Sequence, residues 1–185
     1  HSCFTTVASG NLFKQVTHIN GEPSNGQTSK VGDIVSYKIT FTNTSVYGNT
    51  LYDVRFSDQE QANLSLVEPG TAGCAYPSYD GVPLPAAATL PAVLPTYVDG
   101  TATGGLALWE PDPATGASQI DLLVGESVTT YMCAEITGGA IGDQVFNEAN
   151  VQVDIFNPDT GVFETNTISS AAAVPITDGG SITGT

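Results

Sequence analysis

Apolar and polar residues alternate at every second position along much of this chain, while the spacing of an amphipathic helix is nearly absent. A period of two is typical of a β-strand with one buried and one exposed face. Four runs show the pattern, and their expected core positions are Val35, Tyr37, Ile39 and Phe41; Tyr52, Val54 and Phe56; Val128, Met132, Ala134 and Ile136; and Val145, Ala149, Val151, Val153 and Ile155. Clusters of Gly, Asn, Asp and Pro separate these runs, as expected for short antiparallel strands.

Two loops share a turn signature, "DPATG" at 112–116 and "NPDTG" at 157–161. In each, proline fixes φ early in the turn and glycine supplies the left-handed residue that closes a hairpin. We therefore expect a β-hairpin at each position.

The pattern predicts an all-β protein whose residues 11–174 form an immunoglobulin-like antiparallel β-sandwich. Residues 1–10 are expected to form an extended N-terminal arm, and residues 175–185 a C-terminal tail. Between about residues 69 and 119 the alternation is lost and the sequence becomes rich in Pro, Ala and Gly. We expect a long insertion there that packs over the sandwich.

Charge limits the classes of partner. Nineteen acidic and four basic residues give a net charge of -15, which repels nucleic acid and anionic lipid. No apolar run approaches the roughly eighteen residues of a membrane-spanning helix, so membrane insertion is not expected. The chain begins His1-Ser2-Cys3 without Met, which we interpret as a processed protein that is secreted and exposed at the cell surface.

Three cysteines are consistent with an extracellular setting. Cys74 and Cys133 are candidates for a disulfide, which leaves Cys3 either free or paired with another molecule; sequence alone does not fix the pairing. The tripeptides "NTS" and "NLS" make Asn43 and Asn63 candidate glycosylation sites.

Strand parity directs three polar residues toward the expected core. Lys14, one of only four basic residues, shares a face with Leu12 and Val16. By the same alternation Asp58 lies on the face of Phe56, and Asn147 on the face of Val145, Ala149, Val151 and Val153.

A buried lysine favours its neutral amine and a buried carboxyl its protonated form. One hypothesis is therefore a self-crosslink in which a neutral Lys14 amine attacks the Asn147 amide, with Asp58 carrying protons, to give a Lys–Asn isopeptide bond and ammonia. Two other interpretations remain open. One is an unreacted Lys14–Asp58 ion pair hydrogen-bonded to Asn147. The other is three unrelated residues that reach solvent or close turns.

Five segments in order resemble the secreted prokaryotic surface-protein repeat modules known as the domain of unknown function 11 family. They are "LFK" (12–14), "VGDIVSYKITFTN" (31–43), "DVRFSD" (53–58), "VGESVTTYMCAEI" (124–136) and "FNEANV" (146–151). The resemblance covers about a third of the chain, and it implies an immunoglobulin-like module of adhesins, stalks or matrix proteins without catalytic turnover. It also places Lys14, Asp58 and Asn147 where the family carries Lys, Asp and Asn.

Other chemistry has weaker support. His1 at a free N-terminus is a candidate copper ligand, with His18 as a third nitrogen. Loop carboxylates make calcium possible, although without a recognisable ligand spacing; they are Asp80, Asp99, Asp112, Asp121, Asp143 and Asp159. We expect no other cofactor, the metal ligands are unknown, and no hydrolase or phosphate-binding motif is present.

The leading hypothesis is a structural subunit that polymerises with itself into an extracellular filament or surface matrix, the N-terminal arm adding a strand to a neighbour. The alternative is an adhesin or carbohydrate-binding module that recognises surface glycans or other cell-surface proteins. Its aromatic platform would comprise Tyr76, Tyr79, Tyr97 and Trp109.

Overall fold

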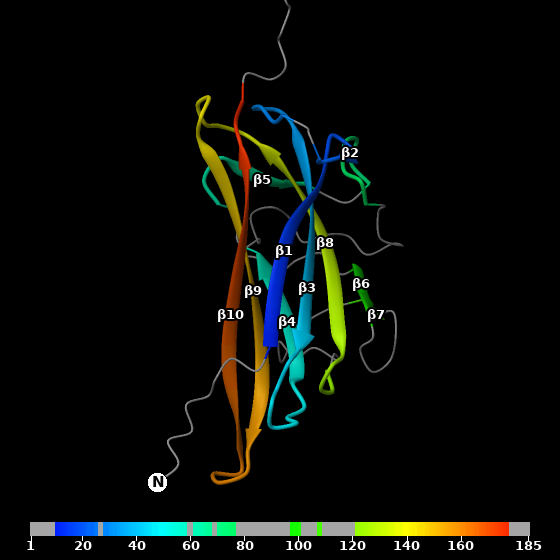
Figure 1. Cartoon of the computed structure of the whole chain (residues 1–185), viewed down its shortest axis with the longest axis vertical. Helices are drawn as coiled ribbons and strands as arrows, with labels where there is room; N and C mark the ends of the chain where they lie inside the picture. The colour runs from blue at the N-terminus through cyan, green and yellow to red at the C-terminus, as the bar shows by residue number, and fades with distance from the viewer. Residues whose placement is uncertain are drawn as a thin grey trace, which may run out of the picture.

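The computed structural model describes residues 10–25, 28–58, 61–67, 70–76, 97–100, 107–108 and 121–177. Over these residues the chain forms ten strands and no helix, so it offers no helix able to cross a membrane (Figure 1). The strands are β1 (Gly10–Ile19), β2 (Glu22–Pro23), β3 (Ile34–Asn43), β4 (Tyr52–Asp58), β5 (Leu64–Val67), β6 (Tyr97–Gly100), β7 (Ala107–Leu108), β8 (Ser127–Ile136), β9 (Gln144–Asn157) and β10 (Val162–Pro175).

The strands form two sheets, and within each sheet every pair of neighbouring strands is antiparallel. The first sheet has the order β2-β1-β3-β8-β6-β7, with β5 also pairing with β8, and the second has the order β10-β9-β4. The two sheets pack face to face over one core, which confirms the predicted immunoglobulin-like antiparallel β-sandwich.

The core consists of the alternating apolar residues of the long strands. Along β3 and β9 every second side chain is buried, as the sequence pattern predicts. The largest fully buried side chains are Tyr37, Phe41, Phe56, Ile39, Leu51, Leu122, Met132, Ile136, Val35 and Val54. Completely burying one such side chain stabilises the fold by roughly 1.5–3 kcal/mol, so the core is the main source of stability.

One predicted core residue is placed wrongly by parity. Tyr52 is 37% exposed, because Asp53 adopts a left-handed conformation at φ 55° and the register with β9 shifts between Tyr52 and Arg55. The irregularity breaks the period of two. Leu51 is buried instead and exchanges two backbone hydrogen bonds with Leu122, at 2.9 and 2.8 Å.

The turn at 157–161 is a hairpin between β9 and β10, as predicted. Gly161 has φ 72°, and its N–H donates to the Asn157 carbonyl at 2.8 Å. The Asn157 side chain caps the turn by accepting from the Asp159 N–H at 2.9 Å. The companion signature at 112–116 lies outside the described residues.

The insertion contributes strands to the first sheet. β6 pairs with β8 and with β7, so this part of the predicted segment 69–119 extends a sheet. The rest of the insertion beyond residue 76, the arm at residues 1–9 and the tail at residues 178–185 lie outside the described residues.

A disulfide joins Cys74 to Cys133 on β8, 59 residues apart, as one of the expected pairings. Cys3 lies outside the described residues. The disulfide anchors the start of the insertion to a central strand, where Cys133 is buried beside Ser36.

Replacing both Cys74 and Cys133 by alanine should lower the free energy of unfolding by about 4 kcal/mol, because the unfolded chain then gains the entropy of an open loop of this length. Denaturant unfolding measures the difference. The matched control is Cys3→Ala, which removes a thiol outside the pair and should leave the free energy unchanged. A loss below about 1 kcal/mol in the double variant would show that the disulfide contributes little.

Candidate crosslink site

Lys14, Asp58 and Asn147 come from three different strands and are all inside the sandwich. Lys14 lies on β1 opposite Ile39, Asp58 on β4 opposite Ala149, and Asn147 on β9 opposite Ala172. Their exposed fractions are 3%, 0% and 1%. The inward orientation expected from strand parity is therefore present, and the site joins the first sheet to the second.

The Lys14 ammonium has three contacts in the core. It forms a direct ion pair with Asp58 Oδ2. It also lies 3.6 Å from the sulfur of Met132 and 4.5 Å from the centre of the Tyr37 ring. An aromatic face stabilises a nearby cation, so Tyr37 compensates part of the hydration that Lys14 loses.

Met132 brings Asn147 close to the lysine. The Asn147 Nδ2 atom lies 3.8 Å from the same sulfur that contacts Lys14 Nζ at 3.6 Å. Both nitrogens therefore rest against one atom of β8. A thioether is flexible and only a weak hydrogen-bond acceptor, so it contacts both nitrogens without holding either one firmly.

Three oxygens at this site have no hydrogen-bond partner among the described residues. They are Asp58 Oδ1, Asn147 Oδ1 and the Tyr37 hydroxyl, and each is buried. Most buried polar atoms in proteins have a partner, and an unpaired one generally costs about 1–3 kcal/mol. Their concentration around one lysine distinguishes this site from an ordinary core.

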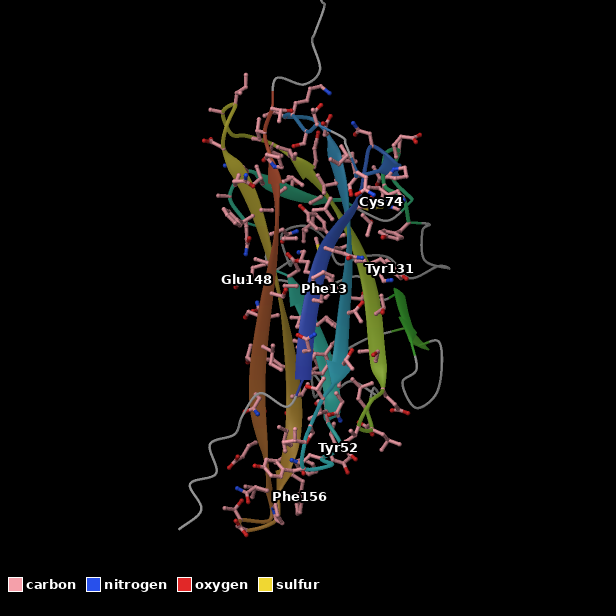
Figure 2. All side chains as sticks on the ribbon, in the orientation of Figure 1. Phe13, Tyr52, Cys74, Tyr131, Glu148 and Phe156 are labelled. Carbon is pink, nitrogen blue, oxygen red and sulfur yellow. A yellow bond between two sulfur atoms is a disulfide. The ribbon has the colours of Figure 1, made fainter. Side chains whose placement is uncertain are left out.

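Burial brings the pKa values of Lys14 and Asp58 closer together. It lowers the pKa of Lys14 from 10.5 to about 8, although Asp58 acts in the opposite direction. It raises the pKa of Asp58 from 3.8 to about 6, against the effect of Lys14. Glu148, which lies next in β9 and faces solvent, adds to the raised pKa of Asp58 and partly opposes the lowered pKa of Lys14 (Figure 2). Transfer of a proton from the lysine to the aspartate is consequently much less costly than in water.

The backbone of Lys14 also reaches the second sheet. Its N–H donates to the Ser170 hydroxyl of β10 at 3.2 Å, across the margin where β1 and β10 run side by side (Figure 1). Lys14 is thus fixed at its backbone as well as at its amine.

The glycosylation candidates differ in accessibility. Asn43 is only 1% exposed, and its Nδ2 donates to the carbonyls of Asn49 and Leu122 at 2.8 and 2.9 Å. The nitrogen that would carry a glycan is therefore occupied in the fold, which speaks against Asn43 as a site. Asn63 is exposed, and glycosylation there stays a prediction.

The candidates for metal and glycan binding fall mostly outside the described residues. His1, Asp80, Asp112, Tyr79 and Trp109 do so, as do the side chains of Tyr97 and Asp99. Within the described part of the chain, no group of three His, Cys, Asp or Glu side chains is placed to hold a metal ion. Calcium and copper binding stay predictions.

The described members of those two sets have other contacts. The Tyr76 hydroxyl lies 2.6 Å from the Thr17 hydroxyl, and its ring packs against Tyr131 at 4.3 Å between centres. His18 Nδ1 lies 2.9 Å from Thr17, and the histidine ring meets Tyr76 edge-on. The Tyr76 side chain therefore packs against Thr17, His18 and Tyr131 of the sandwich.

A group of exposed aromatics escaped the sequence analysis. Phe163 packs edge-on against Tyr52 at 5.5 Å and against Phe156 at 5.4 Å. Tyr52 and Phe156 lie toward the end of the molecule that carries the β9–β10 turn (Figure 2). The bulge at Asp53 turns Tyr52 outward, and strand alternation in the sequence does not predict this bulge.

Comparison with protein families and with curated proteins finds no match. Among solved structures, domains D2 and D3 of the major pilin SpaD from Corynebacterium diphtheriae are similar over 87% of this chain, at 14% identity and TM-score 0.42. The pilus backbone protein RrgB from Streptococcus pneumoniae is similar over 92%, at 15% identity and TM-score 0.36. AvmM, which catalyses macrocyclization in alchivemycin A biosynthesis, is similar over 92%, at 12% identity and TM-score 0.40.

The chain spans 51% of the SpaD fragment, 49% of RrgB and 91% of AvmM. Each of these TM-scores is below 0.5, and no role is assigned from them. The resemblance to the domain of unknown function 11 family stays a prediction.

Proposed function

We propose that this chain is a secreted structural subunit of an extracellular filament or surface matrix, and that a Lys14–Asn147 isopeptide bond locks its two sheets together. The buried arrangement of Lys14, Asp58 and Asn147 around Met132 is the observation that carries the proposal. A permanent crosslink between the first strand and a late strand suits a protein that must resist extension, and it needs no substrate.

The chemistry begins from the ion pair. Lys14 passes one proton to Asp58, and the neutral amine attacks the side-chain carbonyl carbon of Asn147. Asp58 then returns this proton to Nδ2 of the asparagine, the bond from this nitrogen to the carbon breaks, and ammonia leaves. The new bond joins Lys14 Nζ to the Asn147 carbonyl carbon, and Asp58 accepts the second proton that the Lys14 nitrogen loses as it becomes an amide. The departing ammonia takes up this second proton and leaves as ammonium, so Asp58 ends as the carboxylate with which it began.

The surroundings favour this route. Water is excluded from all three side chains, which keeps the amine from being resolvated and strengthens electrostatic interactions inside the site. The strand pairings hold the backbones of the three residues in place, so little entropy is lost in bringing them together.

Assembly is proposed to use the N-terminal arm as an added strand. β10 is the strand to which this idea applies: it runs for 14 residues in continuous register with β9 and has no second pairing partner among the described strands, while β1 lies along its other margin and the Lys14 N–H bonds Ser170 there. Glu164 is its only charged residue. Edge strands generally carry lysines, prolines or bulges that prevent pairing with another chain, and β10 has only Pro175 at its end.

Location outside the cell is supported by the disulfide between Cys74 and Cys133, because such bonds persist mainly in oxidising compartments. The large negative charge is compatible with a soluble precursor that assembles only through a specific strand pairing.

The intact mass of the denatured, reduced protein should be lower than the sequence mass by one ammonia, and peptide mapping should find the segments around Lys14 and Asn147 joined. Lys14→Arg and Asn147→Ala remove the nucleophile and the amide, so both variants should keep the full sequence mass. Asp58→Asn, which preserves shape but cannot carry the proton in the same way, should stay largely unreacted. An unshifted wild-type mass after complete folding would contradict the proposal.

The rate of ammonia loss after refolding should be greatest between about pH 6 and pH 8 and fall on both sides. Below the raised pKa of Asp58 the pair holds two protons, so Lys14 stays an ammonium and cannot attack. Above the lowered pKa of Lys14 both protons are gone, and no acid remains to protonate the leaving nitrogen. Mass spectrometry of samples quenched at intervals gives the profile. A rate that rises steadily through pH 10 would exclude Asp58 as the proton carrier.

Purified full-length protein should form filaments that light scattering and electron microscopy detect, whereas a variant lacking residues 1–9 should stay monomeric. The control is the truncated protein's own crosslink, which should form normally because the site lies in the sandwich. A full-length protein that remains monomeric at high concentration would refute assembly through the arm while leaving the crosslink unaffected.

A further inference from the structure

The hydroxyl of Tyr37 is the least expected feature of the site. Tyr37 belongs to the central strand β3, is completely buried and packs within the hydrophobic core. Its hydroxyl nevertheless has no hydrogen-bond partner among the described residues. Buried tyrosines generally bond their hydroxyl, and a phenylalanine would fill this position without an unpaired polar atom.

Tyr37 lies next to Lys14 and Met132 in the first sheet. It pairs with Met132 of β8 on one side and Val16 of β1 on the other, two residues along from Lys14. Its ring lies under Lys14 Nζ, at 4.5 Å from the centre. The Asn147 amide lowers the pKa of the Tyr37 hydroxyl, so the two groups interact, although neither this hydroxyl nor Asn147 Oδ1 has a hydrogen bond of normal geometry among the described residues.

The proposed reaction creates a need for a donor at this place. When Lys14 Nζ attacks, the Asn147 carbonyl becomes tetrahedral and its Oδ1 acquires negative charge. That oxygen has no hydrogen-bond donor among the described residues in the unreacted structure. Asp58 cannot serve it throughout, because its proton is required by the departing nitrogen. A second donor is therefore needed to stabilise the charge in a site without water.

We propose that the Tyr37 hydroxyl donates a hydrogen bond to Asn147 Oδ1 as the tetrahedral intermediate forms, and so acts as the oxyanion donor of the crosslinking reaction. This inference rests on the proposed isopeptide chemistry. Tyr37 keeps its proton throughout: the hydroxyl stabilises the charge while the proton from Lys14 moves through Asp58 to the leaving ammonia. No oxidant or further reactant is required.

The electrostatics of the site agree with this role. Burial raises the pKa of Tyr37 well above its usual range, the charge of Asp58 raises it further, and Asn147 lowers it by less than these two effects raise it, so the hydroxyl remains a donor at every pH at which the reaction runs. The ring and the hydroxyl have separate tasks, since the ring face contacts Lys14 and the hydroxyl serves the carbonyl. Tyr37→Phe removes only the second of these.

The experiment compares wild type and Tyr37→Phe, each recovered unfolded and unreacted, then refolded and sampled by intact mass. We expect Tyr37→Phe to lose ammonia about 100-fold more slowly, the effect of removing one oxyanion donor. Tyr52→Phe is the matched control, because it removes the same atom from an exposed ring far along the sandwich, and it should react at the wild-type rate.

A second measurement separates chemistry from folding. In an Asn147→Ala background, which cannot react, Tyr37→Phe should leave the melting temperature unchanged or raise it, because it deletes a hydroxyl without a partner. A slow reaction together with an unchanged melting temperature supports the donor role. If Tyr37→Phe reacts as fast as wild type, the inference is overturned while the crosslink stands. If wild type itself loses no ammonia, both fail.

Discussion

Removing Lys14 and Asp58 from water is the physical constraint on which the rest of this structure depends. A buried ion pair gains attraction in a low-dielectric interior, yet desolvation costs several kcal/mol for each ion, so such a pair seldom stabilises a fold better than apolar residues would. The fold compensates only in part, with the Tyr37 ring and the Met132 sulfur near the amine. Three oxygens of the site have no hydrogen-bond partner in the described part of the chain, which is costly if the site is purely structural and reasonable if it is a reactant state.

The same desolvation explains why the site lies between the sheets. The three side chains reach one another only because β1 closes against β10 and the second sheet covers the first. Asn43 and the Leu51–Leu122 bridge hold the connecting segments at the ends of β3 and β4, which keeps this covering in place. In the proposed reaction, folding therefore has to be nearly complete before amine and amide meet, so the fold itself would set the timing of the crosslink.

The β-sandwich and the inward orientation of the site residues could be predicted from the sequence. The period of two fixes which face of a strand a residue occupies, so the inward orientation of Lys14, Asp58 and Asn147 followed from counting. Counting fails where the period breaks, as at Asp53, and thus misplaced Tyr52. Sequence patterns also do not tell how deeply a residue is buried. A sequon made Asn43 a candidate glycosylation site, whereas its side-chain amide donates hydrogen bonds in the interior. The roles of Met132 and Tyr37 depend on packing across strands, which alternation along one strand does not report.

The direction of the strands has a mechanical consequence. β1 begins in the half of the sandwich that carries the β9–β10 turn, and β10 ends at the opposite end, where Ile176 pairs with Ser29 (Figure 1). Tension applied at the two ends of the described chain is therefore directed along the strands, at right angles to the hydrogen bonds between them. Under such shear, many hydrogen bonds between strands have to break at the same time rather than one after another. Among the described strands β1 and β10 share no backbone pairing, so side-chain contacts hold the margin between them, and Lys14 lies on it.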